Sequence, residues 1–145
     1  MIDTRTAAYG ALILRVALGA LLLVHFALKY FVLTPAGTIQ FFGSLGLPPA
    51  LAYLTMLVEL VAGAALVLGI WARLAALAAV PVLLGAVAFV HLGNGFFCSA
   101  PNGGWEYPAF WAVALVVQAL IGDGAYALVP TPVKADADRT VAVRS

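Results

Sequence analysis

The sequence is short of charge. Only 9% of its 145 residues are Asp, Glu, Lys or Arg, whereas 65% are hydrophobic. A soluble globular domain carries roughly 25% charged residues because its surface must be hydrated, so this chain is expected to be solvated by lipid. The formal net charge is only +1, and no dense basic patch is visible of the kind that nucleic-acid binding needs.

Cysteine is equally scarce, since Cys98 is the only one in the chain. One cysteine excludes an internal disulfide, a metal site with two or more cysteine ligands, and dithiol–disulfide chemistry within a single chain. The two histidines and the glutamates show none of the local spacings of metal motifs, and flavin and haem-attachment motifs are missing too. We therefore predict no intrinsic metal, haem or flavin cofactor.

The chain does have four long apolar segments. Most approach the ~20 residues that cross a hydrocarbon core of ~30 Å, and Gly- and Pro-containing turns separate several of them. We predict an all-α, polytopic membrane protein in which residues 1–130 form a four-helix transmembrane bundle. The spans are expected at about 8–33, 50–70, 74–92 and 107–120, the first as an uncleaved helix, and residues 131–145 as a disordered cytoplasmic tail.

Orientation follows from the positive charges near the ends of these spans. Arg5, Arg73 and the basic residues of the C-terminal tail fall on one side, and only Lys29 lies near the other. Because positively charged residues are retained in the cytoplasm, both termini are expected there. The segments 35–49 and 91–108 are then expected to face outward.

An internal repeat is suggested by the two histidines. The pattern that ends at His25 resembles the one that ends at His91, and the surroundings of Glu59 resemble those of Gln118 at the same spacings from a preceding Pro-Ala and a following Gly. This pattern predicts two tandem helical hairpins related by a pseudo-twofold axis along the membrane normal.

Ionisable side chains inside the predicted spans are the main candidates for function, because a charge at bilayer depth costs several kcal/mol unless it is paired or hydrated. Arg15, His25 and Lys29 share one stripe of the first helix. With Glu59 near mid-membrane and His91 at a span end, a polar cluster is expected in the outer half of the bundle. The segment 91–108 would cover it.

Structural roles compete with functional ones at each of these positions. Glu59 would serve equally well as the ion-pair partner of Arg15 or Lys29, and Lys29 could instead extend to the outer interface. The histidines could simply hydrogen bond between helices. Arg15 is expected to be structural, as part of an ion pair, and Cys98 to be a bystander.

The ordered set of these residues resembles the DoxX family of four-helix membrane proteins over about 14–128. The resemblance rests on Arg15 with His25-x3-Lys29, Gly46-Leu47-Pro48, Glu59 with Gly63 and Leu68-Gly69, Arg73, His91 with Asn94-Gly95-Phe96, and Gly103-Gly104-x-Glu106-Tyr107-Pro108. It implies a multi-pass protein of the plasma (inner) membrane that is linked to quinone-dependent redox or oxidative-stress chemistry and works beside soluble partner proteins.

Such a function suggests specific roles. A quinone needs an apolar slot, hydrogen-bond donors at its carbonyls and a route for protons. The predicted site has Glu59, His91 and His25 as catalytic residues and a quinone-binding set of Lys29, Glu106, Tyr107, Phe26 and Phe96. A non-catalytic membrane anchor or assembly factor and a small-molecule carrier remain alternatives. The expected partners are the lipid bilayer and a soluble redox protein, with a homodimer left open.

Overall fold

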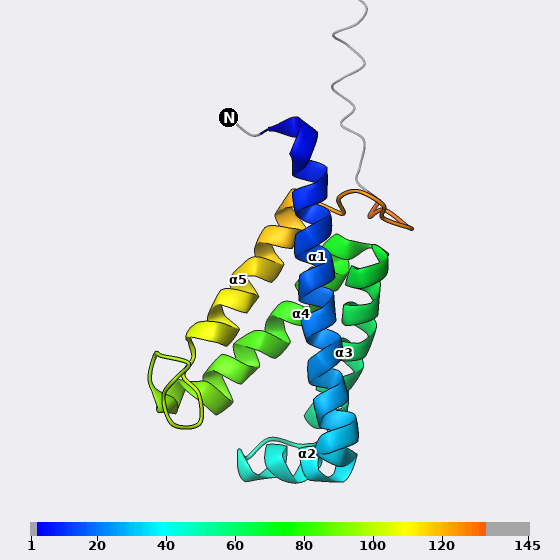
Figure 1. The fold of residues 1–145 in the computed structure, drawn as a ribbon. Coiled ribbons are helices and arrows are strands. Elements are labelled where there is room, and N and C mark those ends of the chain that lie inside the picture. The colour runs from blue at the N-terminus through cyan, green and yellow to red at the C-terminus, as the bar shows by residue number, and fades with distance from the viewer. Residues whose placement is uncertain (1–2, 133–145) are drawn as a thin grey trace, which may run out of the picture.

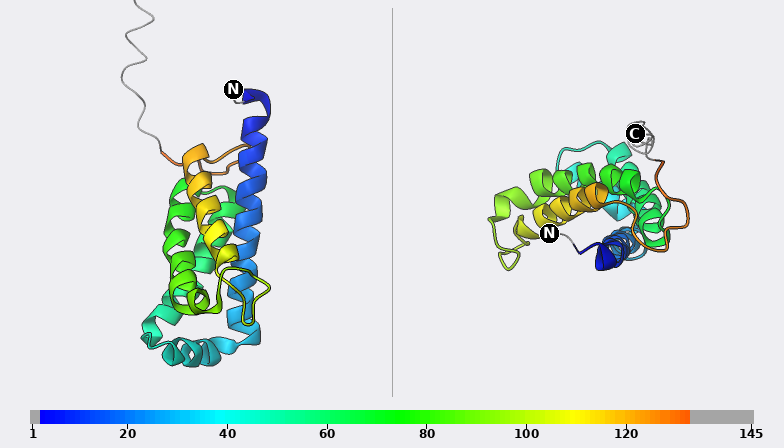
Figure 2. Two further views of the ribbon diagram at one scale, coloured as in Figure 1. Left: turned by 90° about the vertical axis from the view of Figure 1, so that its left-hand side faces the viewer. Right: turned by 90° about the horizontal axis from the view of Figure 1, so that it is seen from above.

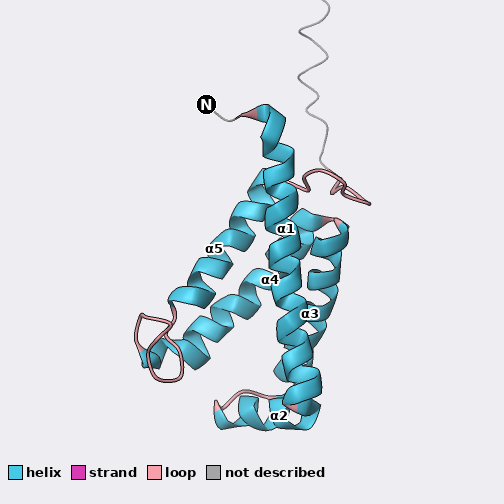
Figure 3. Cartoon of the chain, viewed as in Figure 1, coloured by secondary structure: helices cyan, strands magenta, loops and turns pink. Residues whose placement is uncertain are grey.

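The computed structural model describes residues 3–132, and it is helical as the sequence predicts (Figures 1 and 3). Two helices end in short π-helical segments, and a 3₁₀ turn follows the second of them. The elements are α1 (Thr4–Ala27), η1 (Leu28–Val32), α2 (Thr34–Ser44), α3 (Pro49–Leu68), α4 (Ala72–Gly85), η2 (Ala86–His91), η3 (Leu92–Asn94) and α5 (Glu106–Ile121).

Three helical stretches are long and apolar enough to cross a membrane. They are Arg5–Val32, Pro49–Leu68 and Ala72–Asn94, and α5 is a shorter apolar helix of 16 residues. Large apolar side chains such as Ile13, Phe110 and Leu120 point outward and are about 70% exposed, with values of 69%, 72% and 72%. A surface of this kind suits lipid and not water, and the protein is a multi-pass membrane protein.

The long helices run alternately up and down, and α2 crosses one end of the molecule (Figures 1 and 2). The start of α1 and the segment after α5 lie together at the opposite end. In the packing, α1 lies mainly against α3, and α4 lies mainly against α5. The fold therefore consists of two helix pairs, α1–α3 and α4–α5, joined side by side through α3 and α4.

The α1–α3 pair depends on two glycines that let the helix backbones approach closely. A Cβ atom on Gly19 would lie 2.7 Å from the carbonyl oxygen of Gly63, and one on Gly63 would lie 2.9 Å from Cγ of Leu23. Small residues serve this purpose in membranes, where packing replaces the hydrophobic effect as the force between helices. The α4–α5 interface instead uses buried alanines, including Ala76, Ala79 and Ala112.

Arg15 closes the end of the first pair. Its guanidinium donates to the carbonyl oxygens of Leu66, Val67 and Ala125, at 2.9 Å each. The last carbonyls of a helix lack partners within it and carry partial negative charge, so the cation stabilises the end of α3. Gly69, at φ +70°, leaves room for the guanidinium of Arg15, because a Cβ atom at this position would lie 2.7 Å from Nη1.

Arg73 makes the equivalent contact in the second pair. Its Nη1 donates to the carbonyls of Ala119 and Leu120 at the end of α5, at 3.1 and 3.4 Å. Gly122, at φ +102°, again leaves the space, since a Cβ there would lie 2.7 Å from Nη2 of Arg73. In each pair, an arginine from the first helix thus binds the C-terminal end of the second helix beside a glycine.

Residues 122–132 form a strap across this same end. The N–H of Ala125 donates to the carbonyl of Ala8, and that of Trp71 donates to the carbonyl of Val129. Asp123 accepts from the N–H of Ala72 at 2.9 Å and from both the N–H and the hydroxyl of Thr131. The sequence predicts here only that the last span ends at about residue 120. Of the predicted tail, residues 133–145 lie outside the described residues.

Candidate functional site

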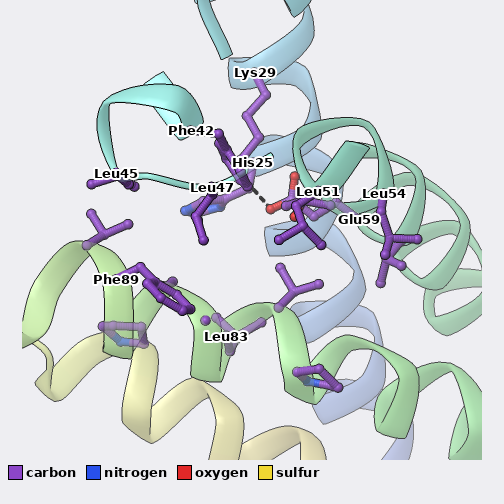
Figure 4. Close-up of a pocket in the computed structure, with 18 of the residues that line it drawn as sticks. His25, Lys29, Phe42, Leu45, Leu47, Leu51, Leu54, Glu59, Leu83 and Phe89 are labelled. Atoms are coloured by element: carbon purple, nitrogen blue, oxygen red, sulfur yellow. Dashed lines mark hydrogen bonds and ion pairs between the residues drawn. The ribbon is translucent and has the colours of Figure 1, made fainter. Parts of the chain in front are cut away.

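A cavity of about 510 Å³ lies between the two helix pairs, and α2 covers it (Figure 4). Its walls are mostly apolar, with Phe42 from α2, Leu45 just after it, Leu51 from α3, and Leu83 and Phe89 from α4 and η2. The volume is typical of a site for a small organic ligand. The charged groups of the lining, Lys29 and Glu59, lie where η1 faces α3.

Lys29 and Glu59 form an ion pair there, with 2.6 Å between Nζ and Oε1. Glu59 lies in the middle of α3 and is only 3% exposed, whereas Lys29 belongs to the π-helical segment η1. π-Helical turns inside α-helices occur frequently at functional sites. Of the two cations considered as partners for Glu59, Lys29 is the one in contact.

His25 lies beside this pair on the same wall of the cavity. Its Nδ1 is 2.9 Å from the carbonyl oxygen of Leu21. A carbonyl only accepts, so Nδ1 carries a proton, and in the neutral ring Nε2 then offers a lone pair. The ring also packs edge-on against Trp111 of α5, with 4.9 Å between ring centroids.

Two buried polar atoms on this wall have no hydrogen-bond partner within the described part of the chain. They are Oε2 of Glu59 and Nε1 of Trp111, and both residues line the cavity. Buried polar groups in proteins are nearly always hydrogen bonded, so these two groups are candidates for hydrogen bonds to a ligand in the cavity. Trp111 was missed by the sequence prediction, because a tryptophan in an apolar helix resembles any other lipid-facing or core residue.

The cavity brings together four of the residues predicted for the site. His25, Lys29 and Glu59 form its polar wall, and Tyr107 lines it from the start of α5. Arg15 lies two to three turns away along α1, toward the strap, where its guanidinium has carbonyl oxygens as hydrogen-bond partners.

The remaining predicted residues lie outside this cavity. His91 donates from Nδ1 to the carbonyl of Gly103, at 2.9 Å, and so holds the segment 91–108 in shape. Phe96 packs against Trp105 in that segment, and Phe26 stacks on Tyr30, with 5.5 Å between centroids. The expected cover over the polar cluster is supplied by α2, because the segment 91–108 folds back on itself beside η2 and α5 (Figure 1).

Glu106 also stabilises the segment 91–108. Its Oε1 accepts the backbone N–H of Cys98 at 2.8 Å, and it lines a shallow depression with Phe96 and Phe110. The nearby carboxylate, through its hydrogen bond with the thiol and its negative charge, raises the pKa of the exposed Cys98. A higher pKa leaves less of the reactive thiolate at neutral pH, in keeping with a bystander role for this cysteine.

Comparison with known proteins bears directly on this arrangement. The family model described as DoxX matches residues 10–92, which are more than half of the chain and include His25, Lys29 and Glu59 of the polar wall. The chain belongs to the DoxX family.

A relative in Bacillus subtilis (strain 168) carries the name "Putative oxidoreductase CatD". The two sequences are 34% identical over 121 residues, which cover 83% of this chain and 85% of the relative. No solved structure matches the chain. Membership of the DoxX family and the name of this relative associate the protein with membrane redox chemistry.

Proposed function

We propose that the protein is a small membrane subunit of quinone-dependent redox chemistry, and that the cavity between the helix pairs binds the quinone. The observation that carries the proposal is an apolar cavity with one polar wall, formed by Lys29, Glu59 and His25. A quinone has the matching form, since it is a flat apolar ring with polar oxygens. Intramembrane ionisable residues that face a cavity are associated with proton and substrate pathways.

The residues of the polar wall can supply the protons that a quinone takes up when it is reduced. Reduction of a quinone to a hydroquinone takes up two electrons and two protons. Lys29 can donate a hydrogen bond to a quinone oxygen, and His25 and Glu59 can exchange protons with it. The chain itself has neither a cysteine pair nor a flavin or haem motif, so we propose that a partner protein or the substrate delivers the electrons.

In the proposed topology the protein lies in the plasma membrane and α5 is its fourth span. Both termini are then in the cytoplasm. Two tandem hairpins related by a pseudo-twofold axis are supported by the matched contacts of Arg15 with Gly69 and of Arg73 with Gly122. The open side of the cavity then lies toward the outer half of the membrane, beneath α2.

A membrane anchor or assembly factor is the second candidate. It is supported by the outer segment 91–108, whose Phe97 is 65% exposed although the segment is held by its own hydrogen bonds. In that case the ion pair would serve only helix packing. A small-molecule carrier has less support, because four helices make a narrow bundle.

The test compares two substitutions of neighbouring alanines. Ala86 lines the cavity, whereas Ala88 is exposed and does not line it. The full chain in lipid nanodiscs is titrated with duroquinone, whose fully substituted ring cannot react with thiols or amines, and empty nanodiscs correct for partition into lipid. We expect saturable binding that Ala86→Phe abolishes and Ala88→Phe preserves.

Binding that is absent, or that survives in the Ala86→Phe variant, would refute a quinone site in this cavity. The anchor function would then be tested by recovery of partner proteins from native membranes with the same two variants. Both should recover the same partners if the cavity has no part in docking.

A further inference from the structure

The hydrogen-bonding groups of the cavity wall distinguish between the two redox forms of a quinone. This inference rests on the proposed function, because it concerns which form the same cavity prefers. A quinone oxygen is a carbonyl and can only accept hydrogen bonds, whereas a hydroquinone oxygen is a hydroxyl that both donates and accepts. The preference of the cavity therefore depends on which groups of its wall accept hydrogen bonds and which donate them.

The acceptors come from α1 and α3. Nδ1 of His25 donates to the carbonyl of Leu21, so in the tautomer with one ring proton Nε2 is an acceptor, and the residue lines the cavity. Glu59, paired with the ammonium of Lys29 at 2.6 Å, accepts through Oε1, and its Oε2 is buried without a partner among the described residues. A quinone carbonyl cannot satisfy either acceptor.

The donors come from α5 and η1. Nε1 of Trp111 is a buried indole N–H that finds no partner in residues 3–132, and an ammonium such as that of Lys29 has two further N–H groups besides the one given to Glu59. Either form of the ligand can accept from these donors. The wall thus combines acceptors that need a hydroxyl with donors that tolerate both a hydroxyl and a carbonyl.

The geometry points to a cavity that binds the hydroquinone in preference to the quinone, with one hydroxyl of the ring donating to Glu59 or His25 and accepting from Trp111. A hydrogen bond to a charged carboxylate that one form makes and the other leaves unmade corresponds to about tenfold or more in affinity. Preferential binding of the reduced form raises the reduction potential of the bound couple by about 30 mV per tenfold. The bound quinone is thereby a stronger electron acceptor than the free quinone.

Three probes with the same tetramethyl ring test this preference. Durohydroquinone, duroquinone and the dimethyl ether of durohydroquinone are titrated anaerobically into the full chain in nanodiscs, with empty nanodiscs as the reference. We expect durohydroquinone to bind at least about tenfold more tightly than duroquinone. The dimethyl ether, which cannot donate, should bind no better than duroquinone.

Two substitutions locate the preference on the wall. Glu59→Gln replaces the charged acceptor by an amide that can also donate, so it should weaken binding of durohydroquinone and bring the ratio of the two affinities close to one. Trp111→Phe keeps an aromatic ring and removes the N–H, so it should weaken both ligands together. Trp71→Phe, half-exposed at the other end of the molecule, is the matched control and should change neither, and circular dichroism verifies that each variant is folded.

The outcomes separate this inference from the function on which it rests. Equal affinities for the two redox forms, or a preference that Glu59→Gln leaves intact, would overturn the inference while the quinone site stands. Failure of both forms to bind would overturn the proposed function as well. Tighter binding of durohydroquinone that disappears in Glu59→Gln supports both.

Discussion

The ion pair between Lys29 and Glu59 predicts an unequal effect of removing its two members. The Lys29 side chain is 18% exposed and that of Glu59 is 4% exposed. Lys29→Met leaves a carboxylate buried without its cation, a change that costs about 3–5 kcal/mol at buried pairs. Glu59→Gln leaves an ammonium on a long stem near the cavity opening, where it can turn toward the interface, so we expect a cost of about 1 kcal/mol.

The double variant Lys29→Met/Glu59→Gln removes both charges and should be more stable than Lys29→Met alone, because no unpaired charge remains. For a chain of this length, 1 kcal/mol corresponds to roughly 4 °C in melting temperature. We therefore expect Lys29→Met to melt about 12–20 °C below the original chain when unfolding in detergent is followed by tryptophan fluorescence. The double variant should recover at least half of this loss, and strictly additive effects of the two substitutions would refute the ion pair as a coupled unit.

Three further predictions concern the packing of the bundle. Gly19→Leu should destabilise the protein by several kcal/mol because α1 and α3 cannot stay in contact, whereas Gly10→Leu, with open space around it, should change the melting temperature little. Gly69→Ala should cost more than Gly46→Ala, although both have φ near +70°, because only the former meets Arg15; equal costs would contradict the packing argument. Asp123→Asn should destabilise the protein at pH 7 and progressively less below pH ~4.

The sign of the Asp123 prediction follows from its contacts. Burial alone raises the pKa of this carboxyl, but the hydrogen bonds from Thr131 and from the backbone of Ala72 and Arg73 outweigh it and hold the pKa below its ordinary value. A lowered pKa means that stability is gained above the unfolded pKa of ~3.9 and is lost as the pH falls through the folded one. Chemical denaturation of both proteins at pH 7 and pH 3 measures the difference, and a gap that widens in acid would contradict it.

Much of the architecture could be predicted because it depends on local pattern. Four apolar segments and the turn residues between them indicate the three long helical stretches and the shorter α5, and the 3.6-residue period places His25 and Lys29 on one face of the first stretch. Glu59 could be recognised because a carboxylate in an apolar span is costly unless it is paired. These predictions from hydropathy, periodicity and buried charge do not depend on which helices pack against one another.

The rest depends on packing between distant segments. Trp111 joins the site only because α5 brings it against His25, and nothing in its own sequence neighbourhood indicates this. The alternative pairing of Glu59 with Arg15 was equally consistent with the sequence. It is the Gly19–Gly63 crossing that sets α1 against α3 so that Lys29, and not Arg15, meets the carboxylate.

The two ends of the molecule differ in a way that favours a ligand site at one of them. At the strap, Arg15 and Arg73 tie the ends of α3 and α5 to neighbouring helices, and Asp123 ties the strap to α4. At the other end, α1 and α4 both finish in π-helical segments, and the cavity separates the two pairs. Because these hydrogen bonds tie one end together, we expect hydrogen exchange in nanodiscs to be slow in residues 63–69 and fast in residues 28–45, at the end that holds the cavity. Addition of durohydroquinone should slow exchange in the second region alone, and a uniform response along the chain would show that the two ends do not move independently.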